Sequence, residues 1–82
     1  MNYLFFVSKS CSLCNGMYDK SMKLFEKFNI EGKTIDISEN PKLRGKYNVF
    51  SAPTVIILEN EKEVHRESGF FDFYMLQKII SR

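Results

Sequence analysis

The hydrophobic positions of this chain show two kinds of pattern, one typical of strands and one typical of helices, and the two take turns along the sequence. Residues 3–7 and 54–58 are short continuous apolar runs, typical of strands buried on both faces. Residues 33–37 alternate and predict another strand, and the more polar residues 63–68 predict an edge strand after a turn at 59–62. Between these runs, apolar residues at helical spacing predict a long helix over 11–28 and shorter helices over 41–47 and from 73 onward.

Residues that favour turns and caps separate these elements. Asn29 to Gly32 is expected to end the first helix, and Asn40 with Pro41 is typical of a helix start. Gly69 breaks the last strand, and Asp72 is expected to cap the last helix. The order β-α-β-α-β-β-α, read as two crossovers and a hairpin, predicts an α/β fold with a mixed sheet and helices on both faces.

Length and charge narrow the function class. The 82 residues predict a single domain, 1–82, with a small core. The net charge is +2 and no basic block occurs, so we expect no nucleic-acid partner. No stretch approaches the ~20 apolar residues of a membrane span, and no signal peptide is visible at the N-terminus. We therefore expect a soluble cytoplasmic monomer with no membrane partner.

The only two cysteines, Cys11 and Cys14, carry the candidate chemistry. If the helix begins at Cys11, its free N–H groups favour a thiolate there, with Lys9 as a second positive charge. Cys14 would lie one turn further on, at a spacing that allows a disulfide. We expect Cys11 to be exposed and Cys14 to be shielded. This asymmetry suits a two-step exchange in which one thiolate attacks and the other resolves.

A metal site or a purely structural role fits the two cysteines less well. Structural zinc takes four ligands, and the chain offers two cysteines and one distant histidine, His65. Only a dimer sharing two such pairs could complete a zinc site, so no metal is expected. His65 is expected to have a surface or edge role. Pro53, just before the strand 54–58, is by itself an ordinary strand-entry proline, and X-Pro bonds favour trans.

Taken together, these segments resemble small dithiol oxidoreductases with the thioredoxin fold, of glutaredoxin size. The apolar strand followed by Cys11-Ser12-Leu13-Cys14 resembles the active-site junction of that family, and residues 35–64 resemble the thioredoxin segment that ends in Pro-Thr and an apolar strand. The resemblance implies a four-stranded mixed sheet flanked by helices. It also implies that Pro53 is a cis-proline facing the dithiol and that the Ala52 backbone pairs with a substrate strand.

The resemblance has specific gaps. Ser12-Leu13 matches neither the Gly-Pro of thioredoxins nor the Pro-Tyr common in glutaredoxins, and Ser10 replaces the usual aromatic before the first cysteine. Phe5 stands where thioredoxins place a buried acid. The glutathione signature of glutaredoxins is also incomplete, because Gly69 is followed by Phe70 and Asp72 comes later than expected.

The sequence thus predicts a thiol–disulfide oxidoreductase with Cys11 as nucleophile and Cys14 as resolving thiol. The resemblance implies disulfide-containing protein substrates, and a reductase or a low-molecular-weight thiol as electron source. No cofactor is expected beyond the Cys11–Cys14 disulfide itself. Alternatives are a glutaredoxin-like donor to one specific reductase, or a non-catalytic adaptor or metal-binding module. Residues expected to contact substrate are Ala52, Pro53, Leu13 and Phe50, with Phe70 and Phe71 as further candidates for an apolar rim.

Overall fold

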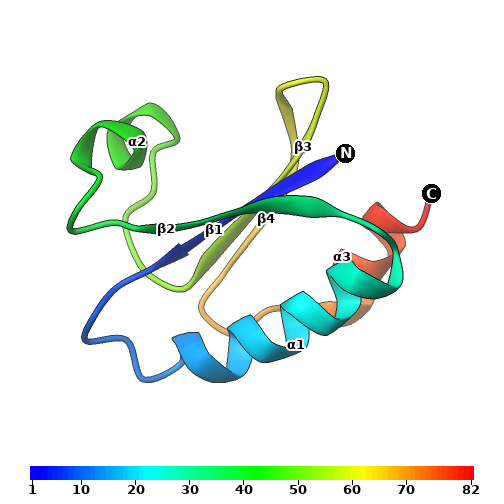
Figure 1. Ribbon diagram of the computed structural model, residues 1–82, viewed down its shortest axis with the longest axis horizontal. Helices are drawn as coiled ribbons and strands as arrows, with labels where there is room; N and C mark the ends of the chain where they lie inside the picture. The colour runs from blue at the N-terminus through cyan, green and yellow to red at the C-terminus, as the bar shows by residue number, and fades with distance from the viewer.

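The computed structural model describes residues 1–82 and contains four strands and three helices in the predicted order (Figure 1). The strands and helices are β1 (Asn2–Val7), α1 (Cys14–Lys27), β2 (Glu31–Asp36), α2 (Pro41–Lys46), β3 (Thr54–Glu59), β4 (Lys62–Ser68) and α3 (Phe73–Ile80).

The strands form one mixed sheet in the order β2-β1-β3-β4. β1 is parallel to β2 and antiparallel to β3, and β4 is antiparallel to β3. The predicted second crossover is therefore wrong, because only the β1–α1–β2 unit joins parallel strands. β2 ends and β3 begins at the same end of the sheet, so the segment carrying α2 returns to the end that it left.

The alternation of side chains along β1 divides the core into two layers. Phe5 points to the layer under α1 and α3, whereas Leu4 and Phe6 point to the layer under α2. Figure 1 shows α1 and α3 on one side of the sheet and α2 on the other. Helices on both faces are confirmed. The first layer is the more aromatic: Phe5 meets both Tyr18 and Phe71 edge to face.

Residues in the left-handed region close two of the connections. Asn29, at φ 56°, follows α1, and the N–H of Ile30 donates to the carbonyl of Phe25 at 2.8 Å. This is the pattern in which a left-handed residue closes a helix and its successor bonds back to the last turn. The β3–β4 hairpin turns at Asn60 and Glu61, both with positive φ, as a two-residue hairpin requires.

Asn40 behaves differently from the prediction. It is the residue before α2 and Pro41 is the first helical residue, but its side chain makes no capping bond. Its amide instead donates to the carbonyl of Asp36 at 3.1 Å. Asp72 caps α3 as predicted, accepting from the N–H of Met75 at 3.0 Å.

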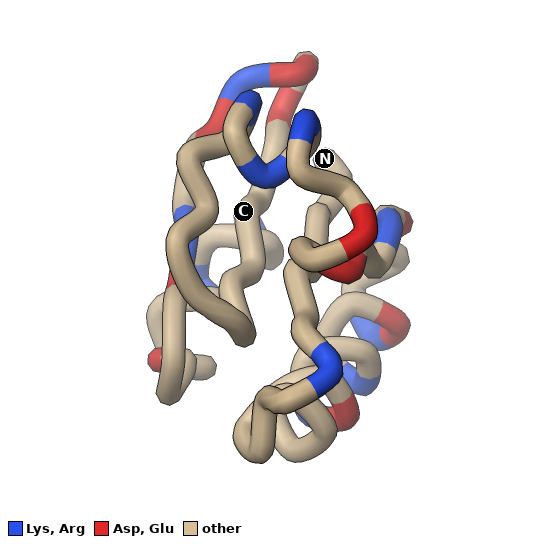
Figure 2. The backbone as a smooth tube through the Cα atoms, turned by 90° about the vertical axis from the view of Figure 1, so that its left-hand side faces the viewer, with Lys and Arg blue, Asp and Glu red and all other residues tan.

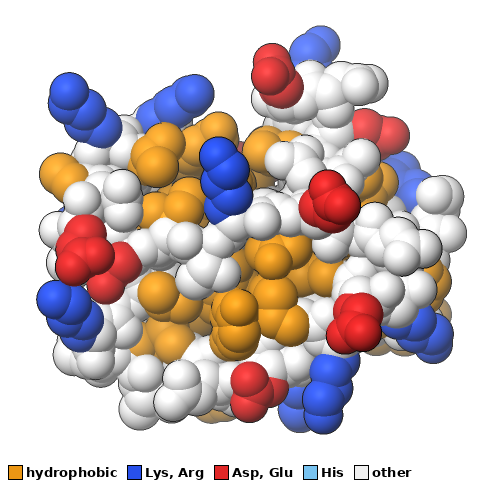
Figure 3. Space-filling view, viewed as in Figure 1, with side chains coloured by type: hydrophobic (Ala, Val, Ile, Leu, Met, Phe, Trp, Pro, Cys, Tyr) orange, Lys and Arg blue, Asp and Glu red, His pale blue; other side chains and the backbone are white.

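The exposed surface is mixed in character. Figure 3 shows hydrophobic side chains gathered in the middle of one face, with charged side chains scattered around them. None of the three helices has both the length and the apolar character needed to cross a membrane.

Candidate active site

Four loops meet at one end of the sheet. Val7, the last residue of β1, pairs with Asp36 at the end of β2, and Phe6 pairs with Thr54 at the start of β3. Thr54 in turn pairs with Ser68 at the end of β4. Four loops therefore leave or enter the sheet at this end, and they comprise residues 8–13, 37–40, 48–53 and 69–72. Figure 2 shows the backbone turned by 90°, with long stretches that carry no charged residue.

The cysteines lie in the first of these loops and the first turn of α1. The prediction that the helix begins at Cys11 is wrong, because α1 begins at Cys14 and Leu13 is its N-cap. Cys11 lies in a turn, where its N–H donates to the carbonyl of Ser8 at 3.4 Å. The polar Ser8-Lys9-Ser10 turn extends through Leu13, since helical hydrogen bonding starts only with the N–H of Met17 to the carbonyl of Leu13.

The two cysteines form a disulfide and differ in exposure. Their Cα atoms are 5.4 Å apart. Cys14 keeps only 5% of its surface exposed, whereas Cys11 is half-buried. The expected shielding of Cys14 is confirmed, whereas Cys11 is more accessible than Cys14 but not as fully exposed as predicted.

The electrostatics at the pair come mainly from the helix. The N–H groups of Cys14, Asn15 and Gly16 make no main-chain hydrogen bond, so they lie free at the positive end of the α1 dipole, beside the disulfide. Lys9 contributes less than expected, because its ammonium lies 3.5 Å from the carboxylate of Glu39 and both side chains are largely exposed.

No carboxylate is buried near the sulfurs. The only buried polar side chains are those of Ser21 and Thr54. Phe5, which stands where the family resemblance leads one to expect an acid, is fully buried in the layer under α1. Asp36 is engaged elsewhere: hydrogen bonds from the hydroxyl and then the N–H of Ser38 hold its pKa below the usual value. Protons leaving the dithiol must therefore pass to solvent or substrate.

The loop 48–53 brings the proline to the same end of the sheet. The Ala52–Pro53 peptide bond is cis, as the resemblance implies. Pro53 is buried, and its carbonyl accepts from the N–H of Gly69 at 3.0 Å. The N–H and C=O of Ala52 make no hydrogen bond within the chain. One free donor and one free acceptor are therefore available at a half-buried residue next to Pro53.

The aromatic candidates separate clearly. Phe50 and Phe70 are 82% and 77% exposed, although both are large and apolar. Phe71 is 7% exposed and belongs to the core, so of the three rim candidates only Phe50 and Phe70 remain. Its N–H points at the sulfur of Met17 on α1, 3.4 Å away. Leu13 lies between the cysteines in the sequence and is half-buried, as is Cys11, whereas Ser12 is exposed.

The remaining candidates lie elsewhere. His65 is on the edge strand β4, where its Nε2 lies 2.6 Å from a carboxylate oxygen of Glu67. The edge placement of His65 is confirmed. No group of three His, Cys, Asp or Glu side chains in the chain is placed to hold a metal ion.

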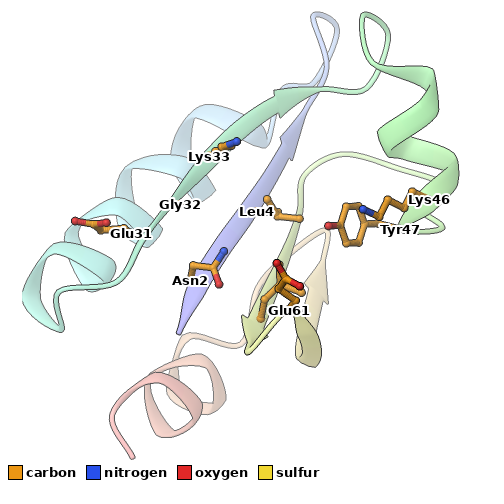
Figure 4. A pocket seen from close by; sticks show the side chains of 9 residues that line it. Asn2, Leu4, Glu31, Gly32, Lys33, Lys46, Tyr47 and Glu61 are labelled. Atoms are coloured by element: carbon orange, nitrogen blue, oxygen red, sulfur yellow. The ribbon is translucent and has the colours of Figure 1, made fainter.

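A cavity lies at the opposite end of the sheet. It measures about 610 Å³ and lies where β1 and β2 begin, between the sheet and the end of α2. Figure 4 shows Tyr47 and Leu4 in it, with charged side chains around them. Two lysines and two glutamates line it: Lys33, Lys46, Glu31 and Glu61. It contains neither cysteine.

Known proteins share this fold. The sequence model of the Thioredoxin family matches residues 3–82. The chain belongs to the thioredoxin family. Thioredoxin 1 from Thermosipho africanus has a closely similar structure, with a TM-score of 0.90 and 34% identity over 100% of this chain and 92% of that one. A thioredoxin-fold mixed sheet flanked by helices, as predicted, is thereby confirmed.

Sequence relatives are also thioredoxins. The thioredoxin of Bacillus subtilis is 35% identical over 48 residues, which are 58% of this chain and 46% of that protein. The thioredoxin of Chlamydia trachomatis is 40% identical over 48 residues, 58% of this chain and 47% of that protein. The aligned part thus spans about half the length of these two thioredoxins.

Sequence reasoning missed the residues that hold the loop 48–53. The guanidinium groups of Arg44 and Arg66 donate to main-chain carbonyls at the start of this loop. Arg66 gives no local signal, because it is distant in sequence from the carbonyls it contacts and approaches the loop only through the β3–β4 register. That pairing places Arg66 opposite Ile56, on the α2 face of the sheet.

Proposed function

We propose that this thioredoxin-family chain is a thiol–disulfide oxidoreductase that reduces disulfides in protein substrates, with Cys11 as nucleophile and Cys14 as resolving thiol. The observation that carries the proposal is the disulfide-forming pair itself, with Cys11 accessible and Cys14 covered at the free N-terminus of α1. This placement favours a thiolate on the accessible sulfur in the reduced protein.

The first step forms a mixed disulfide. The Cys11 thiolate attacks one sulfur of the substrate disulfide, a new bond forms between Cys11 Sγ and that sulfur, and the second substrate sulfur leaves as a thiolate. The free N–H groups at the start of α1 stabilise the attacking charge before the bond forms.

The second step releases the substrate. Cys14 loses its proton and its sulfur attacks Cys11 Sγ, which restores the Cys11–Cys14 disulfide and frees the first substrate sulfur as a thiolate. Because no carboxylate is buried near the pair, the Cys14 proton goes to water or to a departing substrate thiolate. In total, two electrons pass from the cysteine pair to the substrate, whose two departing thiolates take up protons from Cys14 or from water.

Substrate binding is assigned to the surface around Cys11. An extended substrate segment next to its disulfide pairs with the free N–H and C=O of Ala52 beside Pro53, in the manner of an added strand. Phe50 and Leu13 contact its side chains, and Phe70, equally exposed, belongs to the same surface. The charge-free stretches 10–18, 47–58 and 68–71 suit an uncharged segment.

The oxidised pair needs an electron source. We assign that role to a reductase or a low-molecular-weight thiol, in a reducing compartment such as the cytoplasm, with the chain acting as a monomer. A titration of the Cys11–Cys14 couple tests the direction of transfer. A potential near the roughly −270 mV of thioredoxin supports a reductant, whereas one near roughly −120 mV reverses the direction. Coupled assays with thioredoxin reductase and with glutathione identify the donor.

Two single substitutions test the roles. Cys11→Ser should abolish the catalysis of insulin reduction by dithiothreitol, because the accessible thiol is gone and the remaining one, Cys14, is buried. Cys14→Ser should accumulate a Cys11 mixed disulfide, visible as a mass increase that dithiothreitol reverses. Full activity in Cys11→Ser, or mixed disulfides at Cys14 in preference to Cys11, would contradict the assignment.

A further inference from the structure

Two arginine side chains donate hydrogen bonds to the main chain where α2 leads into the loop 48–53. Arg66 donates from Nη2 to the carbonyl of Tyr47 at 2.6 Å and from Nη1 to the carbonyl of Asn48 at 3.1 Å. Arg44 donates from Nε to the carbonyl of Val49 at 3.1 Å. Three successive carbonyl groups are therefore held by guanidinium donors.

The end of α2 explains why these carbonyls need side-chain donors. Asn48 adopts φ 53°, its N–H donates to Gly45, and the N–H of Val49 donates to Arg44. This closure satisfies the carbonyls of Arg44 and Gly45 in the last helical turn. The carbonyls of residues 47–49, at the negative end of the short helix, have no main-chain donor. A planar guanidinium can reach two neighbouring carbonyls at once, which a lysine ammonium cannot do with the same geometry.

Arg66 is itself held in place. Glu63 accepts from its Nε at 2.8 Å and from its Nη2 at 2.7 Å, so the carboxylate fixes the plane of the guanidinium. This pairing raises the pKa of Arg66 and lowers that of Glu63. Arg66 has no hydrogen bond to either cysteine.

The other end of the loop is also fastened. The hydroxyl of Thr54 donates to the carbonyl of Ser51 at 2.8 Å, and the N–H of Gly69 donates to the carbonyl of Pro53 at 3.0 Å. The carbonyls of residues 47, 48, 49, 51 and 53 therefore all have donors. Those of Phe50 and Ala52 do not, and these residues are the ones assigned to substrate.

We propose that Arg66, assisted by Arg44, is a positioning residue that fixes the loop 48–53 so that Ala52 and Phe50 present a preformed binding edge beside Cys11. This inference rests on the proposed function. It assigns Arg66 to the binding of extended protein substrates and gives it no part in the exchange of sulfur bonds.

The test compares Arg66→Lys with Glu63→Gln. Lys at position 66 keeps the positive charge but loses the planar guanidinium that reaches two carbonyls at once. Gln at position 63 leaves the arginine and its carbonyl contacts in place. For Arg66→Lys we expect the KM for insulin to rise about tenfold, because the binding edge is no longer preformed. Its kcat, and the rate with the small disulfide 5,5′-dithiobis(2-nitrobenzoate), should stay within about twofold of wild type. Glu63→Gln keeps the guanidinium donors but weakens the partner that fixes their plane, so its insulin KM should rise less than that of Arg66→Lys.

Amide hydrogen exchange provides a second measurement that needs no turnover. In Arg66→Lys, exchange at Asn48 and Val49, whose N–H groups are hydrogen-bonded at the start of the loop, should accelerate while that at Val55 in β3 stays unchanged. If Arg66→Lys fails to fold, Arg44→Lys carries the same test. An unchanged insulin KM in the folded variant, equal losses with both disulfides, or unchanged exchange at Val49 would overturn the proposal. Should the wild type reduce neither disulfide, the proposed function fails, and the exchange data still judge the positioning role.

Discussion

The two ends of the sheet differ in shape and in chemistry. The end where β1 and β2 begin has a cavity of about 610 Å³, lined by two lysines and two glutamates but by no cysteine. The end where they finish has the disulfide, free backbone groups at Ala52, and two exposed phenylalanines. Cavity size is therefore a poor guide to function in this protein. A dithiol that acts on other proteins needs an accessible surface, whereas a large pocket is what a small ligand needs.

The largest expected difference between the two ends is catalytic. Cys11→Ser should lower the rate of insulin reduction at least about a thousandfold, since the reacting thiolate is gone. At the far end, the double variant Lys46→Gln/Glu61→Gln removes one charge of each sign from the cavity and should leave the rate within about twofold of wild type. The rates are measured by turbidity and corrected for the folded fraction. Comparable losses of insulin reduction in both variants would show that the two ends of the sheet do not differ in their part in catalysis.

Within the dithiol end, neighbouring phenylalanines should separate stability from binding. Phe71→Ala should lower the free energy of unfolding by about 3–5 kcal/mol, because it empties a buried aromatic site in the first core layer. Phe50→Ala and Phe70→Ala should change it by less than about 0.5 kcal/mol, because their side chains are already in solvent. Urea denaturation of the three variants measures the difference, and equal losses would place all three side chains in the core.

The same exposed pair should matter for protein substrates. Each of Phe50→Ala and Phe70→Ala should raise the insulin KM about fivefold, equivalent to the loss of about 1 kcal/mol of apolar contact. Unchanged kinetics in the double variant would remove both residues from the substrate surface. Urea denaturation and insulin kinetics on the same samples separate the two effects.

At the far end, Gly32 should affect stability and leave catalysis unchanged. A Cβ at this position would overlap the carbonyl oxygen and ring of Tyr3, its partner across β1 and β2. Gly32→Ala should therefore cost about 1–3 kcal/mol, with insulin reduction per folded molecule unchanged.

Gly45→Ala on α2 is the matched control. Nothing lies within 4 Å of the added carbon, so helix propensity alone should stabilise this variant by about 0.5–1 kcal/mol. Equal urea midpoints for the two alanine variants would show that the close approach of Tyr3 has no energetic cost.

The smallest expected effect is a dependence of stability on pH. Arg66 lowers the pKa of Glu63 in the folded protein from its usual 4.5. A lowered folded pKa means that the pair stabilises the fold above pH 4.5 and that this contribution is lost as the pH falls through the folded value. The pair is about one-third exposed, so its contribution should be roughly 0.2–1 kcal/mol. Glu63→Gln should remove this part of the acid sensitivity, measured by urea denaturation between about pH 3 and 7.

Local pattern was sufficient for the elements and the chemistry. Continuous apolar runs identified β1 and β3, because strands buried on both faces need no polar positions. Helical spacing identified α1 but misplaced its start, because the turn at Cys11 to Leu13 carries the same apolar spacing as the helix. The pair of cysteines two residues apart, after a buried strand and before a helix, pointed to the redox chemistry and to the family resemblance.

The tertiary structure decided the surroundings of the pair. β3 runs antiparallel to β1, so the segment with Pro53 enters the sheet at the end where the segment with Cys11 leaves it. No residue near Pro53 or Cys11 indicates this direction of β3. The pairing of Ile56 with Arg66 placed an arginine beside the end of α2. Exposure divided Phe70 from Phe71, although the two are adjacent and chemically identical.

The sequence by itself determined where the cysteine pair lies and which segments form strands and helices, because those depend on local composition and spacing. Only the folded chain decided which loops meet at the dithiol, because strand direction and register depend on contacts between residues that are distant along the chain.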